Sequence, residues 1–214
     1  MTKIQIVIAT VESRLPYASD LALSTGADII VDPVGDGSER SATDNHVRAL
    51  QFADPTADWI VVLEDDAVPI EDFSAVLHSQ LSEIDSDKIV SLYLGKQRPP
   101  SVQPTLQRTI EAASEDVSWL VTKNLYWGVG VCIPGAFVDS ISDHVLTSTH
   151  PWDSSVGRWA LSNSVEVWYS WPSLVDHLDE ETTINHADGM GRSEGRRAWR
   201  TGKPIPHGKT IMIK

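Results

Sequence analysis

The chain has 214 residues, of which 41% are hydrophobic, and its formal net charge at pH 7 is −13. This length and apolar content suit one large globular domain, and the negative charge argues against a general polyanion-binding surface. The single cysteine, Cys132, excludes an internal disulfide framework and a multi-cysteine zinc site. The first apolar run is too short for a signal sequence or a membrane span, so we expect a soluble, cytoplasmic protein.

The first half of the chain alternates between apolar runs and segments with helical spacing. We expect strands at residues 3–10, 28–32, 59–63 and 89–94, and helices near residues 17–24, 42–53 and 71–84. This order predicts an α/β fold with a mostly parallel sheet and helices on its faces. In such sheets, ligands bind outside the carboxyl ends of the strands.

The second half is less regular. Residues 97–118 are polar and contain prolines, which predicts a loop or lid. The run LYWGVGVCIPGAFVDSI predicts an apolar strand, with Gly128 and Gly130 at points of close approach, followed by a short helix. From His150 onward the chain is rich in tryptophan, acidic and basic residues, and we expect irregular structure there.

Charge is unevenly distributed along the chain. The segment from Arg192 to Lys214 contains seven basic residues and one acidic residue, so it carries +6 while the remainder carries −19. Such a tail can bind a small anion or a single phosphate group. The alternative is a solvated or disordered charged terminus.

Three consecutive carboxylates follow the predicted strand at residues 59–63, in the stretch WIVVLEDDAVP. Glu64, Asp65 and Asp66 repel one another unless a cation or hydrogen-bond donors offset their charge. Oxygen ligands at the end of a buried strand are typical of Mg²⁺ or Mn²⁺ sites. The alternative is an acidic turn that interacts with the dipole of the following helix.

Four segments together resemble glycosyltransferases of the GT-A fold: IQIVIAT, the helix with Asn45, Arg48, Ala49 and Leu50, LEDDAVP, and YWGVGVCIP. The LEDD form is most similar to the lipopolysaccharide glycosyltransferase family 25 and small phage-encoded relatives. The resemblance covers roughly residues 1 to 180. It implies a Rossmann-like nucleotide-diphospho-sugar transferase fold, with a mixed sheet flanked by helices.

In this superfamily a D-x-D motif binds the Mn²⁺ or Mg²⁺ that bridges the nucleotide-sugar diphosphate. Here Glu64-x-Asp66 stands in its place, so the resemblance makes Asp66 the metal ligand and Asp65 a partner of the ribose or sugar. It also implies a histidine on the metal, for which we favour His177 over His186. Either histidine can instead have a purely structural role. The donor-binding residues that the resemblance implies are Thr10, Arg14, Arg48, Glu64, Asp65, Arg192, Arg196 and Arg197.

The resemblance also implies a catalytic base, and we assign it to Asp153 in HPWDSSVGRW. A carboxylate there can take the proton from an acceptor hydroxyl. The alternative is that Asp153 only caps a helix that begins near Ser154. Since flat rings stack on sugars and bases, we place Trp127, Gly128 and Trp152 at the acceptor site.

We therefore expect one GT-A-like catalytic domain at residues 1–190, with a donor half at 1–96 and an acceptor half at 119–190. A basic tail or lid at residues 191–214 then closes over the diphosphate. The expected reaction moves a sugar from a nucleotide-diphosphate donor, such as a UDP-sugar, to a hydroxyl on a glycan, a protein or a modified DNA base, with inversion. A phage-encoded enzyme would act in the cytoplasm of its bacterial host. The alternatives are a nucleotidyltransferase and a non-catalytic sugar- or nucleotide-binding module.

Overall fold

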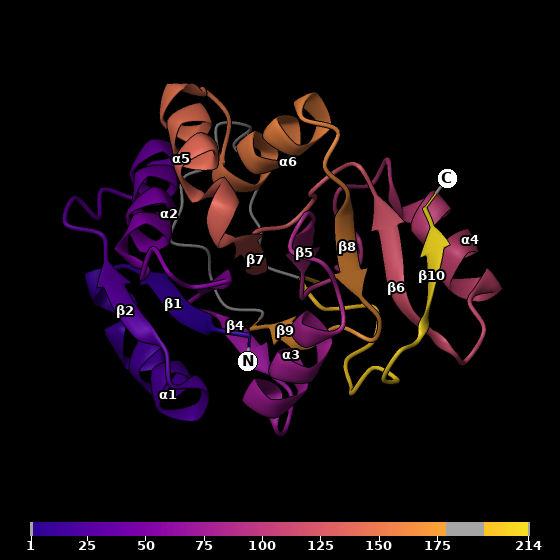
Figure 1. Ribbon diagram of the computed structural model, residues 1–214. Helices are drawn as coiled ribbons and strands as arrows, with labels where there is room; N and C mark the ends of the chain where they lie inside the picture. The colour runs from indigo at the N-terminus through magenta and orange to yellow at the C-terminus, as the bar shows by residue number, and fades with distance from the viewer. Residues whose placement is uncertain (1, 179–194, 214) are drawn as a thin grey trace.

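The computed structural model describes residues 2–178 and 195–213, and within them the chain forms one large mixed sheet with helices on both faces (Figure 1). The strands are β1 Ile4–Thr10, β2 Asp28–Val31, β3 Trp59–Glu64, β4 Ala67–Pro69, β5 Ile89–Ser91, β6 Val117–Thr122, β7 Gly130–Pro134, β8 Val167–Ser170, β9 Val175–His177 and β10 Lys209–Met212. The helices are α1 Leu15–Thr25, α2 Glu39–Phe52, α3 Phe73–Ser82, α4 Gln103–Ala112, α5 Val138–Thr147 and α6 Trp152–Ser162. Two short 3₁₀ helices are η1 Glu12–Arg14 and η2 Gly135–Phe137.

The main sheet of the described chain has eight strands in the order β10-β6-β8-β5-β7-β3-β1-β2. Strand β1 runs parallel to β2 and β3, whereas β7 lies antiparallel between β3 and β5. Strand β8 is parallel to β5, β6 is antiparallel to β8, and β10 is parallel to β6. The expected mixed sheet flanked by helices is confirmed, but the sheet is less parallel than the alternation in the first half predicts.

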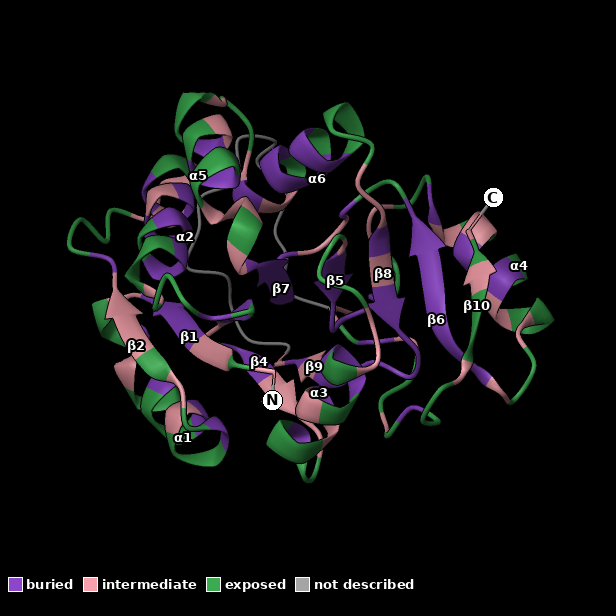
Figure 2. Cartoon of the chain, in the orientation of Figure 1, coloured by how far each residue is buried: buried purple, intermediate pink, exposed green. Residues whose placement is uncertain are grey.

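The sheet buries both of its faces, as Figure 2 shows for its central strands. Successive side chains of a strand point to opposite faces, so Val7 and Ile8 of β1 belong to two different apolar clusters. Side chains from α2, α4, α5 and α6 pack in the cluster with Val7, and side chains from α1 and α3 pack in the cluster with Ile8. The polar groups at the strand ends are therefore held on a rigid base.

Two expectations about irregular segments are wrong. Residues 97–118 are not a loop throughout, because they contain α4 and the first residues of β6, and the proline in the first turn of α4 is Pro104. Proline is compatible with a helix only in its first turn, where its missing N–H has no intrahelical partner to lose. The chain after His150 is also regular, since it forms α6, β8, β9 and β10.

The end of the chain belongs to the main sheet. Strand β10 pairs with β6, and isolated bridges join Gly95 to Ala198 and Ser173 to Thr201. The alternative of a disordered terminus is therefore wrong for Lys209–Met212. The predicted domain boundary at 190/191 lies outside the described residues and stays a prediction. In the described ranges, no helix combines the length and apolar character that crossing a membrane requires.

Candidate functional site

The acidic triplet lies where β3 leaves the sheet. Trp59 to Leu63 are almost completely buried, Glu64 is the last residue of β3, and Asp65 and Asp66 form the turn into β4. Strands β1 and β7 flank β3 on either side. The residues that follow β1 and precede β7 therefore surround the triplet.

Asp65 is held by two residues near the end of β1. The Thr10 hydroxyl donates to Asp65 Oδ2 at 2.7 Å, and Arg14 Nη1 lies 3.2 Å from Asp65 Oδ1 and 3.3 Å from Asp66 Oδ2. Burial raises the pKa of Asp65 to about 6, although the Thr10 hydrogen bond and the Arg14 charge act in the opposite direction. Part of the repulsion in the triplet is thus offset by the protein's own buried guanidinium group.

Asp66 faces His177 across the small β4–β9 sheet, in which Ala67 pairs with His177. The distance between His177 Nε2 and Asp66 Oδ2 is 3.4 Å, and both side chains are buried. His177 Nδ1 is in contact with the Leu178 carbonyl oxygen, which can only accept a hydrogen bond. With the Nδ1 proton donated to the Leu178 carbonyl oxygen, Nε2 and the carboxylate oxygen are two acceptors in contact, and they need a cation or a proton between them.

Glu64, Asp66 and His177 each offer a ligand atom, and these atoms lie within 4.8 Å of one another. Asp66 Oδ1 is buried and has no hydrogen-bond partner, which is costly for a carboxylate oxygen. Burial raises the pKa of Glu64, the Asp66, Asp153 and Asp65 carboxylates raise it further, and the Arg196 guanidinium offsets part of the effect. One carboxylate oxygen each from Glu64 and Asp66 and an imidazole nitrogen from His177 fit a divalent cation.

The helix-dipole alternative does not describe Asp66. Helix α3 begins at Phe73, and its N-cap residue is Asp72, which makes no side-chain capping bond. Asp66 instead lies in the turn before β4. His186, the second candidate for the metal, lies outside the described residues.

Gly128 and the start of α6 form the side of the site next to Glu64. A Cβ atom added to Gly128 would lie 2.8 Å from Glu64 Oε1, 3.2 Å from Trp152 Cδ1 and 3.7 Å from Asp153 Cβ. The residues expected for the acceptor and the base are therefore next to Glu64. Trp127 directly precedes Gly128 in the chain, and its Nε1 donates a hydrogen bond to the Arg98 carbonyl oxygen at 2.9 Å.

Asp153 is the second residue of α6, and the N-cap position is occupied by Pro151. Its Oδ1 accepts a hydrogen bond from the Ser154 backbone N–H at 2.6 Å, so it stabilises the first turn without being the N-cap residue. Burial raises its pKa. A raised pKa makes a carboxylate a stronger base.

His46 also belongs to the site, and sequence reasoning missed it. Its Nε2 lies 3.7 Å from Glu64 Oε1, its ring stacks on Trp152 at a centroid distance of 5.3 Å, and its Nδ1 is 2.8 Å from the Ala42 carbonyl. Burial lowers its pKa. His46 directly follows Asn45 of the motif helix, but only the fold shows that this face of α2 meets Trp152.

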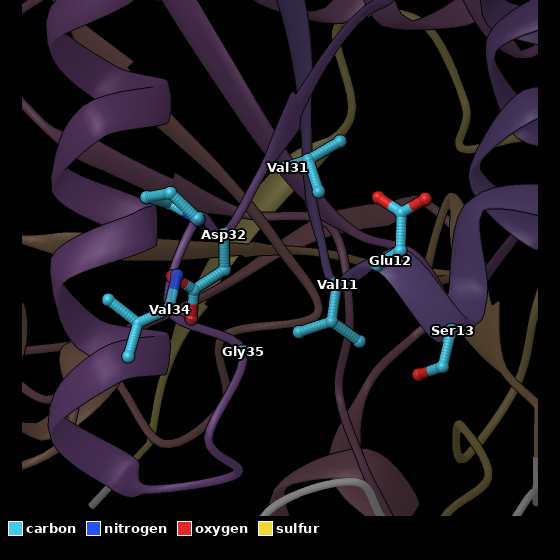
Figure 3. Close-up of a pocket in the computed structure, with 8 residues that line it drawn as sticks. Val11, Glu12, Ser13, Val31, Asp32, Val34 and Gly35 are labelled. Carbon is cyan, nitrogen blue, oxygen red and sulfur yellow. The ribbon is translucent and has the colours of Figure 1, made fainter.

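The ends of β1 and β2 border a hollow of about 710 Å³ (Figure 3). Its lining residues are Val11, Glu12, Ser13, Val31, Asp32, Pro33, Val34 and Gly35. Arg48 lies beside it, with Nη1 3.5 Å from Asp32 Oδ1. Asn45 Nδ2 donates to the carbonyls of Thr10 and Ile30, and so joins the ends of the two strands.

The basic residues of the tail have different surroundings. Arg197 Nη1 lies 3.2 Å from Asp176 Oδ2, so its charge is paired outside the triplet. Arg196 is close enough to act electrostatically on Glu64 and Tyr93. Arg192 lies outside the described residues.

No protein-family model and no curated protein sequence matches the chain. Solved structures with a similar fold include a nucleotidyl transferase from Methanothermobacter thermautotroptrophicus, with 11% identity over 79% of this chain and 88% of that chain and a TM-score of 0.48. Another is a mutant Drosophila β1,4-galactosyltransferase 7 in complex with manganese, UDP-Gal and xylobiose, with 11% identity, 83% and 71% coverage and a TM-score of 0.40. A third is A197 from STIV, with 11% identity, 96% and 97% coverage and a TM-score of 0.45. Likeness at this level does not assign an activity.

Proposed function

We propose that this chain is a metal-dependent glycosyltransferase of GT-A type, which transfers a sugar from a nucleotide-diphosphate donor to a hydroxyl acceptor. The observation that carries the proposal is the group Glu64, Asp66 and His177, whose ligand atoms lie within 4.8 Å of one another. In this proposal Asp66 and His177 hold Mn²⁺ or Mg²⁺, and Glu64 is the third candidate ligand. The ion would neutralise the negative charge that develops on the departing diphosphate.

The neighbouring strands offer a path for the rest of the donor. Strands β3, β1 and β2 are adjacent, and a spacing of about 4.8 Å between strands puts the end of β2 about 10 Å from the end of β3. The diphosphate would lie at the triplet, the ribose beside Asp65, and the base in the hollow next to Asp32. Arg196, whose charge already acts on Glu64, would add a cation on the diphosphate side.

Asp153 is the proposed base. It lies beside Gly128 and Glu64, and burial raises its pKa, which makes it a stronger base. A base on one face of the sugar and a leaving group on the other favour an inverting displacement. Trp152 would form the floor of the acceptor site, and Trp127 would border it.

The metal site can be tested by titrating Mn²⁺ and recording its electron paramagnetic resonance signal, which bound Mn²⁺ loses. The parent is expected to bind one ion, and Asp66→Asn to bind it at least ~10-fold more weakly, since a charged ligand is lost. The matched control is Asp20→Asn, which removes an exposed carboxylate on α1. Equal Mn²⁺ affinity in the parent and Asp66→Asn would remove the metal from the proposal.

Product analysis separates the remaining alternatives. A glycosyltransferase slowly hydrolyses its nucleotide sugar and releases nucleoside diphosphate in a metal-dependent reaction. A nucleotidyltransferase, which would use the same carboxylates, instead releases pyrophosphate from a nucleoside triphosphate and a sugar phosphate. A binding module would bind the nucleotide sugar and leave it intact.

A further inference from the structure

The polar side chains that line the hollow beside β1 and β2 are mostly hydrogen-bond acceptors. Apolar side chains of Val11, Val31 and Val34 line it together with backbone, and its polar side chains are Glu12, Ser13 and Asp32 (Figure 3). None of the eight lining residues has a basic or amide side chain. A ligand there meets side chains that mostly accept hydrogen bonds, with the Ser13 hydroxyl as their one ready donor.

Both carboxylate oxygens of Asp32 already accept hydrogen bonds from the protein. Its Oδ2 accepts from the Ser41 hydroxyl, and its Oδ1 accepts from the Val34 backbone N–H at 3.0 Å and lies 3.5 Å from Arg48 Nη1. Asp32 is also buried, with 5% of its surface exposed. Its carboxylate fixes the shape of the loop after β2 and has little capacity left for a ligand.

The carboxylate of Glu12, in contrast, is open to a ligand. Its side chain is exposed, and it makes no hydrogen bond or ion pair with any residue in ranges 2–178 and 195–213. In Figure 3 its carboxylate stands across the hollow from Asp32, on η1 beside Ser13. η1 is anchored at its far end by buried Arg14, so Glu12 projects from a fixed turn.

From this arrangement we infer that the hollow selects a guanine base, and that the Glu12 carboxylate recognises the base by accepting its hydrogen bonds. This inference rests on the proposed nucleotide-sugar function. Guanine presents two parallel donors, N1–H and the 2-amino group, which match the two oxygens of a carboxylate. Its neighbouring O6 is an acceptor and lies outside this pair of hydrogen bonds.

Other bases fit this pattern less well. Uracil has a single donor, N3–H, between two carbonyl oxygens, and one of them would face a Glu12 oxygen with no proton between them. Adenine and cytosine have one amino donor next to a ring nitrogen that only accepts. Hypoxanthine has the N1–H and O6 of guanine but lacks the 2-amino group. The donor is therefore a guanosine-diphosphate sugar, in place of the UDP-sugar that the resemblance suggests.

The test is direct binding of nucleoside diphosphates to the full chain, measured by calorimetry at fixed Mn²⁺ concentration. GDP should bind about tenfold more tightly than IDP and UDP, since a hydrogen bond to a charged group is worth about this factor. In Glu12→Gln the GDP advantage over IDP should fall to about twofold or less, because an amide presents only one acceptor oxygen. The matched control is Glu115→Gln, an exposed change outside the hollow, which should keep the full GDP preference.

The outcomes separate the inference from the function on which it rests. If UDP binds as tightly as GDP, or if Glu12→Gln keeps the GDP preference, the inference is overturned while the nucleotide site stands. If no nucleoside diphosphate binds with or without Mn²⁺, the proposed function fails and the inference fails with it.

Discussion

Asp65→Asn gives a quantitative test of the electrostatics of the triplet. Burial raises the pKa of Asp65 from 3.8 to about 6, so between these two pH values the native protein binds one proton more than the unfolded chain. Stability then falls as pH rises through this window. A shift of about 2 pKa units corresponds to about 3 kcal/mol, at 1.36 kcal/mol per unit.

The quantity to measure is the free energy of unfolding of the parent minus that of Asp65→Asn, which cannot titrate at this position. It should fall by about 2 kcal/mol between pH 4.5 and pH 7, the part of the window above pH 4.5. Urea unfolding followed by tryptophan fluorescence, with chelator present, provides the values. Subtracting the variant also removes the contribution of His46, whose lowered pKa has the opposite sign.

Asp54→Asn is the control for this measurement. The pKa of Asp54 is lowered, first by its hydrogen bond from Lys3 and then by those from Thr56, so its stabilisation is lost only below the usual aspartate pKa. The difference between the parent and Asp54→Asn should stay constant from pH 4.5 to pH 7. A difference for Asp65→Asn that is constant or rises with pH would refute the reasoning.

Two further variants test the side of the site that Gly128 and α6 form next to Glu64. Asp153→Asn should lower the transfer rate by ~10²-fold or more, the usual contribution of a general base, with donor affinity and melting temperature nearly unchanged; transfer within a few-fold of the parent would rule the base out. Gly128→Ala should weaken Mn²⁺ binding, because the new Cβ would lie 2.8 Å from Glu64 Oε1 and displace that carboxylate; unchanged Mn²⁺ affinity would show that Glu64 is not a ligand.

Sequence periodicity predicts the strands that carry long apolar runs, such as Trp59–Leu63, and the amphipathic helix after it. It does not predict where β7 pairs, because an antiparallel strand between β3 and β5 depends on contacts between residues far apart in the chain. Residues 97–118 differ from the expected loop for a local reason. Pro99, Pro100 and Pro104 suggest a loop, whereas Pro104 is in the first turn of a helix.

The site can be predicted from the sequence where several candidate ligand residues are adjacent in the chain and follow a recognisable strand. The triplet is such a case, since three carboxylates end a buried strand, and the structure brings Asp66 and His177 together as the resemblance implies. Their roles stay predictions. Arg14 is paired with Asp65 and Asp66, and its expected role in donor binding stays a prediction. His46 carries no sequence signal, because its place beside Glu64 follows from how α2 packs against α6.

The pairing of β10 with β6 has a consequence for biosynthesis. Lys209–Met212 is synthesised well after β6, yet it covers the edge of that strand. Until then β6 presents unpaired backbone groups along a strand that is buried throughout in the finished protein. Such an edge is a template for association with other chains. A stop codon between β6 and β10 would therefore yield a product that is prone to aggregate, although its acidic triplet is intact.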